Sequence, residues 1–333
     1  MPGKEGIMRP KVFVTRRLPE GAMRLLAENF TVECNPQDRV LTREELLAGV
    51  QGKEGLLPLL TDRIDGEVLD AAGPQLRVVA NYAVGFNNID LAACTARKIP
   101  ASNTPGVLTD TTADLAMALL LALARKVVPA DAFARAGRYK GWAPLLFLGT
   151  DVHHKTLGLI GFGRIGFAVA RRAAGFDMRI LYCDTVQADP SWERQVGARF
   201  VDQRTLLAQA DFVSLHVPLT PQTQHLMGEA EFKAMKTEAF LINTSRGEVV
   251  DEKALVKALQ QGQIAGAGLD VFESEPAIQP ELKTMDNVVI LPHIASASVE
   301  TRTKMGLVAA QNLIAVLIKK EAPPNCLNPE VFR

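Results

Sequence analysis

The amino-acid sequence predicts an α/β protein with parallel sheets. Short apolar runs of strand length alternate with longer stretches in which apolar residues recur every three or four positions. Strands that alternate with helices along a chain pair as parallel sheets with helices on their faces. The alternation runs through the first hundred residues and resumes at residue 155. Two such series in 333 residues fit two domains, at roughly 150 residues for each.

The first series opens with a strand over 11–15 and an amphipathic helix over 20–28. Thr42 followed by Glu45 has the spacing of a capping box, so a second helix is expected to begin there. Further strands are expected over 55–60 and 76–80.

The stretch 112–125 is apolar nearly all round, which predicts a largely buried helix, and we expect it to bridge the two domains. An irregular stretch follows over 137–155. The last helix carries a core-facing stripe at every fourth position and is expected to return to the first domain after a second bridge near residue 296. That stripe consists of Met305, Ala309, Leu313 and Leu317.

Composition excludes several classes of function. Lys+Arg and Asp+Glu are both 37, and this zero net charge argues against a general binder of nucleic acid or membrane surfaces. The longest apolar run, 115–124, is far shorter than the ~20 residues of a membrane span. The first residues have no apolar core of a signal peptide, so a cytoplasmic protein is expected. The four cysteines lack metal-ligand spacing and are expected to be buried free thiols, and no metal site is expected: Cys34, Cys94, Cys183 and Cys326.

The first chemical signal is a glycine-rich turn, Gly161-Phe-Gly163-Arg-Ile-Gly166. A strand-like stretch precedes it and a helix-like stretch follows, the context in which this motif binds a dinucleotide. Gly161 permits the tight turn, Gly163 lets the backbone approach a pyrophosphate, and Gly166 lets helix and strand pack closely. A purely structural turn is the alternative.

Asp184 ends the next expected strand, 184 − 161 = 23 residues after the first glycine, close to the ~20 typical of the acid that binds the adenosine ribose. A carboxylate there accepts hydrogen bonds from the ribose hydroxyls and repels a 2′-phosphate. Thr185 and Val186 offer no cation, although Arg179 lies a few residues earlier. These residues favour NAD(H) over NADP(H).

Three later strands run into polar residues that suit one reaction: Arg246, Glu275 and His293. Arginine can hold a carboxylate through two parallel hydrogen bonds, and histidine can exchange a proton near neutral pH. A neighbouring carboxylate orients the imidazole and favours its protonated form. Each residue alone could be a surface charge or a loop residue, but together they follow a dinucleotide turn. His216 ends another strand, where it could approach a cofactor or be structural.

At these residues the sequence resembles the D-isomer-specific 2-hydroxyacid dehydrogenases, and within them most the glyoxylate/hydroxypyruvate reductases. Six blocks occur in the family's usual order. They are NYAVGFNNID at 81–90, NTPGVLTD at 103–110, GFGRIG at 161–166, NTSRG at 243–247, GLDVFESEP at 268–276 and LPHIASAS at 291–298.

The resemblance implies a Rossmann NAD-binding domain (108–296) inserted into a discontinuous, flavodoxin-like substrate-binding domain (1–107 and 297–333). It implies that Arg246 binds and polarises the substrate, that Glu275 orients the histidine, and that His293 is the acid/base. It also implies substrate contacts from an apolar wall and two backbone amides, at Leu60, Val84 and Gly85.

The remaining cofactor contacts that the resemblance implies are Arg164, Ile165, His216, Pro218, Thr244, Asp270 and Ala295. Asp270 corresponds to a residue near the nicotinamide carboxamide, and Ala295 stands where relatives usually have glycine. Relatives that use NADP often have a hydroxyl and an arginine around position 184, so Asp184 departs from their pattern. The stretch around Trp142 looks like the family's dimer arm, which implies a homodimer; Trp142 could equally be a plain interface residue or reach a substrate site.

Together these features predict a reductase of small 2-oxo acids, such as glyoxylate and hydroxypyruvate, that takes hydride from NADH. Two alternatives stay open. A phosphite dehydrogenase would have the same three residues with an inorganic anion as substrate. An NAD-sensing, corepressor-like protein would bind the cofactor without turnover, although the chain has no evident extra partner-binding segment.

Overall fold

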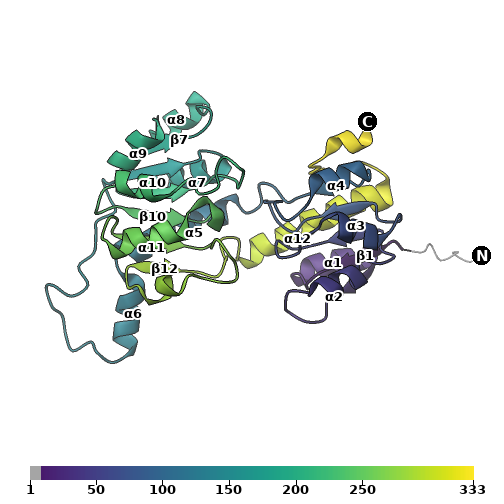
Figure 1. Ribbon diagram of the computed structural model, residues 1–333, viewed down its shortest axis with the longest axis horizontal. Coiled ribbons are helices and arrows are strands. Elements are labelled where there is room, and N and C mark those ends of the chain that lie inside the picture. The colour runs from purple at the N-terminus through teal and green to yellow at the C-terminus, as the bar shows by residue number, and fades with distance from the viewer. Residues whose placement is uncertain (1–8) are drawn as a thin grey trace, which may run out of the picture. The chain divides into compact units, whose positions relative to one another are not determined.

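The computed structural model describes residues 9–333, and the chain divides into two compact units (Figure 1). The first unit comprises Met1–Leu108 with Ser296–Arg333, and the second unit comprises Thr109–Ala295. Among helices of the described residues, none is both long and apolar enough to span a membrane.

The second unit contains a seven-stranded parallel sheet in the order β12-β11-β10-β9-β6-β7-β8. Counted within the unit, this is the Rossmann order 3-2-1-4-5-6 with one further strand, β12, at the edge. The order reverses between β6 and β9, so ligands are expected beyond the carboxyl ends of these two strands. The strands are β6 (Thr156–Ile160), β7 (Arg179–Cys183), β8 (Arg199–Phe200), β9 (Phe212–Leu215), β10 (Phe240–Asn243), β11 (Gly266–Leu269) and β12 (Val288–Ile290).

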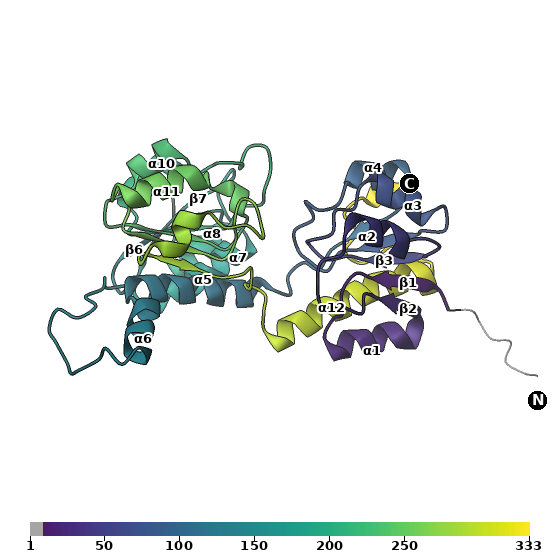
Figure 2. The ribbon, with the colours of Figure 1, turned by 60° about the horizontal axis from the view of Figure 1, so that its bottom comes forward.

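Both faces of this sheet are buried, because alternate side chains of each strand point to opposite cores. Leu157 and Leu159 of β6 pack with α5 (Thr109–Ala124), α7 (Arg164–Ala174) and α8 (Pro190–Val196). Ile160 packs on the other face, beneath α9 (Gln203–Gln209), α10 (Glu229–Ala234) and α11 (Glu252–Gln260). Figure 2 shows α5 on one side of this sheet and α10 and α11 on the other.

The first unit has a five-stranded parallel sheet in the order β2-β1-β3-β4-β5, the flavodoxin-like order 2-1-3-4-5. Its helices are α1 (Glu20–Asn29), α2 (Arg43–Gly49), α3 (Gly66–Ala72), α4 (Leu91–Ala96) and α12 (Val299–Ile314). The strands are β1 (Lys11–Val14), β2 (Thr31–Cys34), β3 (Gly55–Leu57), β4 (Val78–Ala80) and β5 (Ala101–Ser102). The predicted α/β fold class is therefore confirmed for both sheets.

The last helix, α12, packs against α1 and β4 in the first unit. The predicted stripe of Met305, Ala309, Leu313 and Leu317 is buried in the core that these elements share. The long apolar helix α5 is largely buried as predicted, and it belongs to the second unit, where it packs on α7, β10 and β11. The chain changes units just before α5, so the expectation that this helix itself is the bridge is wrong.

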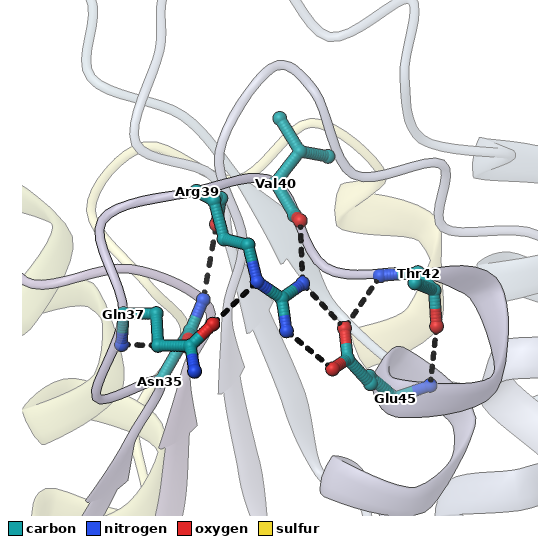
Figure 3. Close-up of polar contacts among 6 residues, drawn as sticks. All are labelled: Asn35, Gln37, Arg39, Val40, Thr42 and Glu45. Carbon is teal, nitrogen blue, oxygen red and sulfur yellow. Dashed lines mark hydrogen bonds and ion pairs between the residues drawn. The ribbon is translucent and has the colours of Figure 1, made fainter.

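The predicted capping box at the start of α2 is present (Figure 3). The Thr42 side chain accepts from the Glu45 N–H, and the Glu45 carboxylate accepts from the Thr42 N–H. The Arg39 guanidinium donates to both oxygens of that carboxylate, at 2.7 and 2.5 Å. The hydrogen bond from Arg39 lowers the pKa of Glu45 to about 2. These contacts close the loop between β2 and α2.

Some expected boundaries are wrong. The strand expected over 55–60 ends at Leu57, because Pro58 has no N–H to donate to a neighbouring strand. The strand expected over 76–80 begins only at Val78. All four cysteines are free, but only Cys94 and Cys183 are buried. Cys34, the last residue of β2, and Cys326, which forms an isolated bridge with Ser102, are half-buried.

Candidate functional site

The glycine-rich turn joins β6 to α7 at the reversal of strand order. Gly161 has φ +93°, and a Cβ there would meet the His216 backbone at 2.7 Å. A Cβ on Gly166 would collide with the Gly161 carbonyl oxygen. Gly163, in contrast, has no atom within 4 Å of its would-be Cβ. Two glycines therefore serve the turn and its packing, while the third leaves open space at the start of α7.

That open space lies where a helix of 11 residues presents its first N–H groups, and Gly163, Arg164 and Ile165 form the beginning of this helix. Free N–H groups and the helix dipole favour a negatively charged ligand there. The residues present fit the pyrophosphate of a dinucleotide, because the backbone can be approached closely at Gly163.

Asp184 lies directly after β7 and reaches the same turn. Its carboxylate accepts from the Phe162 N–H at 2.8 Å and from the Thr185 N–H at 2.7 Å. The side chain is therefore fixed beside the glycines. The sequence motif did not predict this second role, in which Asp184 braces the turn itself.

His293 and Glu275 lie together. The imidazole Nδ1 is 2.9 Å from the Glu275 Oε2, and the other carboxylate oxygen accepts from the Phe272 N–H at 3.0 Å. Burial raises the pKa of Glu275, but the hydrogen bond and charge of His293 outweigh it, so the pKa lies below its ordinary value. Glu275 is therefore a carboxylate at neutral pH, held between a backbone N–H and the imidazole.

Arg246 belongs to the loop after β10. The Asn243 side chain shapes this loop: its amide donates to the Arg246 carbonyl at 2.8 Å, and its oxygen accepts from the Ser245 N–H at 3.0 Å. Burial lowers the pKa of Arg246, while Glu248 and Glu275 act in the opposite direction. Arginine nevertheless stays protonated in proteins. The structure thus supplies a fixed positive charge within the electrostatic reach of Glu275.

The loops of Arg246 and Glu275 touch at Gly247. A Cβ at this position would overlap the backbone of Phe272 and Glu273, so only glycine allows the approach. The Glu275 loop is also held from α11, because the Glu252 carboxylate accepts from the Glu273 N–H at 2.7 Å. Sequence reasoning did not single out Glu252, which is buried and carries no motif.

Asp270 is fully buried at the end of β11. Its two oxygens accept from the N–H groups of Ile294 and Ala295, both at 2.7 Å, and its carbonyl accepts from the His293 N–H at 2.9 Å. His293 adopts φ +54° within this arrangement. Asp270 was expected near a cofactor, and the structure shows that it also fixes the loop that carries the histidine.

The other expected cofactor contacts lie at the same edge of the sheet. Thr244 is buried, and its hydroxyl is one of two buried side-chain oxygens of residues 9–333 without a hydrogen-bond partner. His216 follows β9, its Nε2 is 2.9 Å from the Ser214 Oγ, and burial lowers its pKa to about 4. The carbonyl of Pro218 accepts from the Thr223 hydroxyl.

The expected substrate contacts Leu60, Val84 and Gly85 lie in the first unit, in the loops after β3 and β4. All three are half-buried. No group of three or more histidine, cysteine or acidic side chains that could hold a metal ion occurs within residues 9–333.

Comparisons with known proteins identify the family of the chain. The family model for the D-isomer specific 2-hydroxyacid dehydrogenase NAD binding domain matches residues 117–295. The chain belongs to the D-isomer specific 2-hydroxyacid dehydrogenase family. The resemblance seen in the sequence is thereby confirmed, and the second unit contains the NAD-binding domain.

Similar proteins cover nearly the whole chain. A glyoxylate reductase of Thermococcus litoralis is 52% identical over 98% of this chain and 98% of its own. A crystal structure from Thermus thermophilus is 47% identical and covers 95% of this chain and 99% of its own, with a TM-score of 0.88. The structure of an NADPH-dependent glyoxylate/hydroxypyruvate reductase from Sinorhizobium meliloti is 34% identical, covers 96% and 98%, and has a TM-score of 0.83.

Gly163→Ala tests the phosphate contact. The added methyl group meets no protein atom, so the melting temperature should stay close to that of the wild type. NADH affinity should fall on the order of tenfold, equivalent to about 1.4 kcal/mol, because the methyl group occupies the space that a phosphate would approach. Fluorescence titration with NADH measures this. Gly175→Ala, at the other end of α7, is the matched control, and equal affinities of the two variants would contradict the assignment.

Proposed function

We propose that the protein reduces small 2-oxo acids, with glyoxylate and hydroxypyruvate as substrates, by hydride transfer from NADH. The observation that carries the proposal is the His293–Glu275 pair, with Arg246 in a neighbouring loop, at the carboxyl edge of the sheet that also forms the glycine turn. Relatives named glyoxylate reductases that match nearly the full chain support the choice of substrate.

When bound, a nicotinamide cofactor supplies the hydride. The glycine turn and the start of α7 would hold its pyrophosphate, Asp184 its ribose, and the Thr244 hydroxyl, which has no partner within the described residues, would gain one. His293 gives a proton to the carbonyl oxygen. Its Nδ1 faces Glu275, so Nε2 is the atom that donates. Glu275 fixes the ring through its contact with Nδ1.

We assign substrate binding to Arg246, to the backbone N–H groups of Val84 and Gly85, and to the apolar side chain of Leu60. The guanidinium would pair with the substrate carboxylate and polarise the carbonyl group. An imidazole without these partners could exchange protons but could not hold a 2-oxo acid in place.

For the cofactor, we propose a preference for NAD(H) over NADP(H). The Asp184 carboxylate is held at the glycine turn, where it would repel a 2′-phosphate. Arg179 begins β7, at the opposite end of the strand, and its guanidinium donates to Gln209 at 2.9 Å. Arg179 therefore does not offset Asp184. The Sinorhizobium meliloti relative is NADPH-dependent, so family membership alone does not decide the cofactor.

We also propose a homodimer in the cytoplasm. α6 (Val127–Arg135) and the irregular segment after it stand away from the rest of the second unit in both views (Figures 1 and 2). Trp142 is 84% exposed, and the apolar surface that a partner subunit would cover includes Val127, Val128, Tyr139, Leu145 and Leu148. Four free cysteines agree with a reducing compartment.

The two alternatives are not favoured. A phosphite dehydrogenase or a non-catalytic corepressor would share the fold, but the relatives at about half identity over the full chain are named for glyoxylate reduction. Two assays measured side by side separate these three functions. One follows NADH oxidation with glyoxylate or hydroxypyruvate, and the other follows NAD reduction by phosphite.

His293→Ala removes the proposed proton donor. Turnover with glyoxylate should fall by about 10²- to 10⁴-fold, the usual contribution of general acid catalysis, while NADH affinity is unchanged. Steady-state kinetics and NADH titration measure the two effects. His153→Ala, which changes an exposed histidine of the same unit, is the control. Wild-type turnover in His293→Ala would refute the proposal.

Glu275→Gln should change the pH dependence. The Glu275 pKa is lowered in the folded protein, so its charge is present above the ordinary carboxyl range and is lost only as the pH falls through the lowered value. The Glu275→Gln variant has no such charge to lose, so the acid limb of kcat for glyoxylate reduction that this titration gives the wild type should be absent from its profile. Glu281→Gln, at an exposed site nearby, should keep the wild-type profile. Superimposable profiles of Glu275→Gln and wild type would remove Glu275 from the mechanism.

Asp184→Ser should relax the cofactor choice. Removing the carboxylate takes away the repulsion of a 2′-phosphate and a ribose contact, so the ratio of kcat/KM for NADH to that for NADPH should fall by on the order of tenfold or more. Asp189→Ser, in the following loop, provides a control of equal charge change. A wild type that already prefers NADPH would overturn the proposed preference.

A further inference from the structure

In the loop after β4 of the first unit, three consecutive backbone carbonyl groups each accept a hydrogen bond. The Ala83 carbonyl accepts from the Thr104 N–H at 2.8 Å. The Val84 carbonyl accepts from the Asn103 side-chain amide at 2.7 Å, and the Gly85 carbonyl accepts from the Asn81 side-chain amide at 2.9 Å. Two asparagine side chains thus hold a backbone that belongs to no helix or strand.

The other side of these peptide groups is free. Within residues 9–333, the N–H groups of Val84, Gly85 and Phe86 donate no hydrogen bond, and we call these three groups the amide nest. A peptide group is planar and trans, so its N–H points opposite to its carbonyl oxygen. Holding the carbonyl of Ala83, Val84 or Gly85 therefore aims the N–H of the following residue. Successive N–H groups without partners form a site for an anion.

The asparagines that hold the amide nest are themselves fixed. Asn81 is fully buried, and its side chain exchanges two hydrogen bonds with that of Asn88, at 3.1 and 3.2 Å. The Asn88 amide also donates to the carbonyl groups of Leu59 and Asp62, at 3.0 and 3.2 Å. The loop after β4 is therefore tied to the loop after β3, which carries Leu60.

Asn103 is tied to the last helix instead. Its carbonyl accepts from the Asn312 side chain of α12 at 3.1 Å. Asn312 is fully buried, and its oxygen accepts from the Asn325 N–H at 3.3 Å. The returning helix thus secures the residue that holds the Val84 carbonyl.

We propose that Asn103 and Asn81 are positioning residues for substrate binding. By tying the carbonyls of Val84 and Gly85, they aim the N–H groups of Gly85 and Phe86 at the substrate carboxylate, so that the amide nest has three donors. The inference rests on the proposed function, because the anion it binds is the carboxylate of the 2-oxo acid.

Asn103→Ala is the sharper test, since this side chain makes a single hydrogen bond to the nest. Freed from it, the peptide group of Val84 and Gly85 can rotate, and the carboxylate loses an aligned donor. The KM for glyoxylate should rise by about tenfold, the effect of one hydrogen bond to a charged group. kcat should stay within about twofold and NADH affinity should not change, because proton transfer and cofactor binding use other residues.

Asn29→Ala is the matched control. Asn29 also donates one side-chain hydrogen bond to a carbonyl of the first unit, that of Leu25 at 2.9 Å, but at the end of α1. It should lower the melting temperature at most and leave the KM unchanged. Should Asn103→Ala not fold, Asn103→Asp keeps the side-chain shape, removes the donor and should raise the KM further.

The outcomes separate the two proposals. If the wild type reduces glyoxylate and a folded Asn103 variant keeps the wild-type KM, or if Asn29→Ala raises the KM as much as Asn103→Ala does, the positioning role is overturned and the reductase activity stands. If the wild type reduces no 2-oxo acid, the proposed function fails and this inference fails with it.

Discussion

The arrangement of the candidate site depends on one buried carboxylate, that of Asp270. Burying a charge is unfavourable unless hydrogen bonds replace the lost water, and burial does raise the pKa of Asp270. The N–H groups of Ile294 and Ala295 supply that replacement. The same contacts hold the chain after β12 against the end of β11. Glu275 lies only a few residues beyond Asp270, and His293 immediately precedes Ile294. The hydrogen bonds of Asp270 therefore help to position both Glu275 and His293.

Parallel sheets explain why these residues meet at all. Each strand of a parallel sheet ends at the same edge, so loops far apart in sequence become neighbours there. The loops of Arg246, Glu275 and His293 follow β10, β11 and β12, which are adjacent in the sheet. Gly247 then allows the first two loops to touch. The parallel sheet of the first unit also brings loops together at one edge. There, Asn88 joins the loop after β4 to the loop after β3.

The sequence predicted the elements whose signals are local. The capping box at Thr42, the glycine turn and the stripe of α12 each follow from residues within a few positions of one another. The end of β3 was missed because the apolar run continues past Pro58, although pairing stops there. The bridging role of α5 was wrong because apolar character shows that a helix is buried, but not against which core. The hydrogen bonds of Asp270 and Asn103 go to backbone groups of other loops. The spacing of apolar residues along the sequence does not predict such contacts.

The proposed reaction requires a chain of zero net charge to bind a small anion. Long-range attraction has no overall excess of positive charge to draw on, so recognition falls to short-range groups. Arg246 stays protonated over the working pH range, and backbone N–H groups do not titrate at all. Binding of a substrate carboxylate by these groups, as proposed, would therefore be insensitive to pH. In the proposed mechanism, the pH dependence would come from His293 and Glu275, the pair assigned to proton transfer. With the groups proposed to bind charge separate from those proposed to exchange protons, a change in the protonation of the histidine would leave the binding of the anion in place.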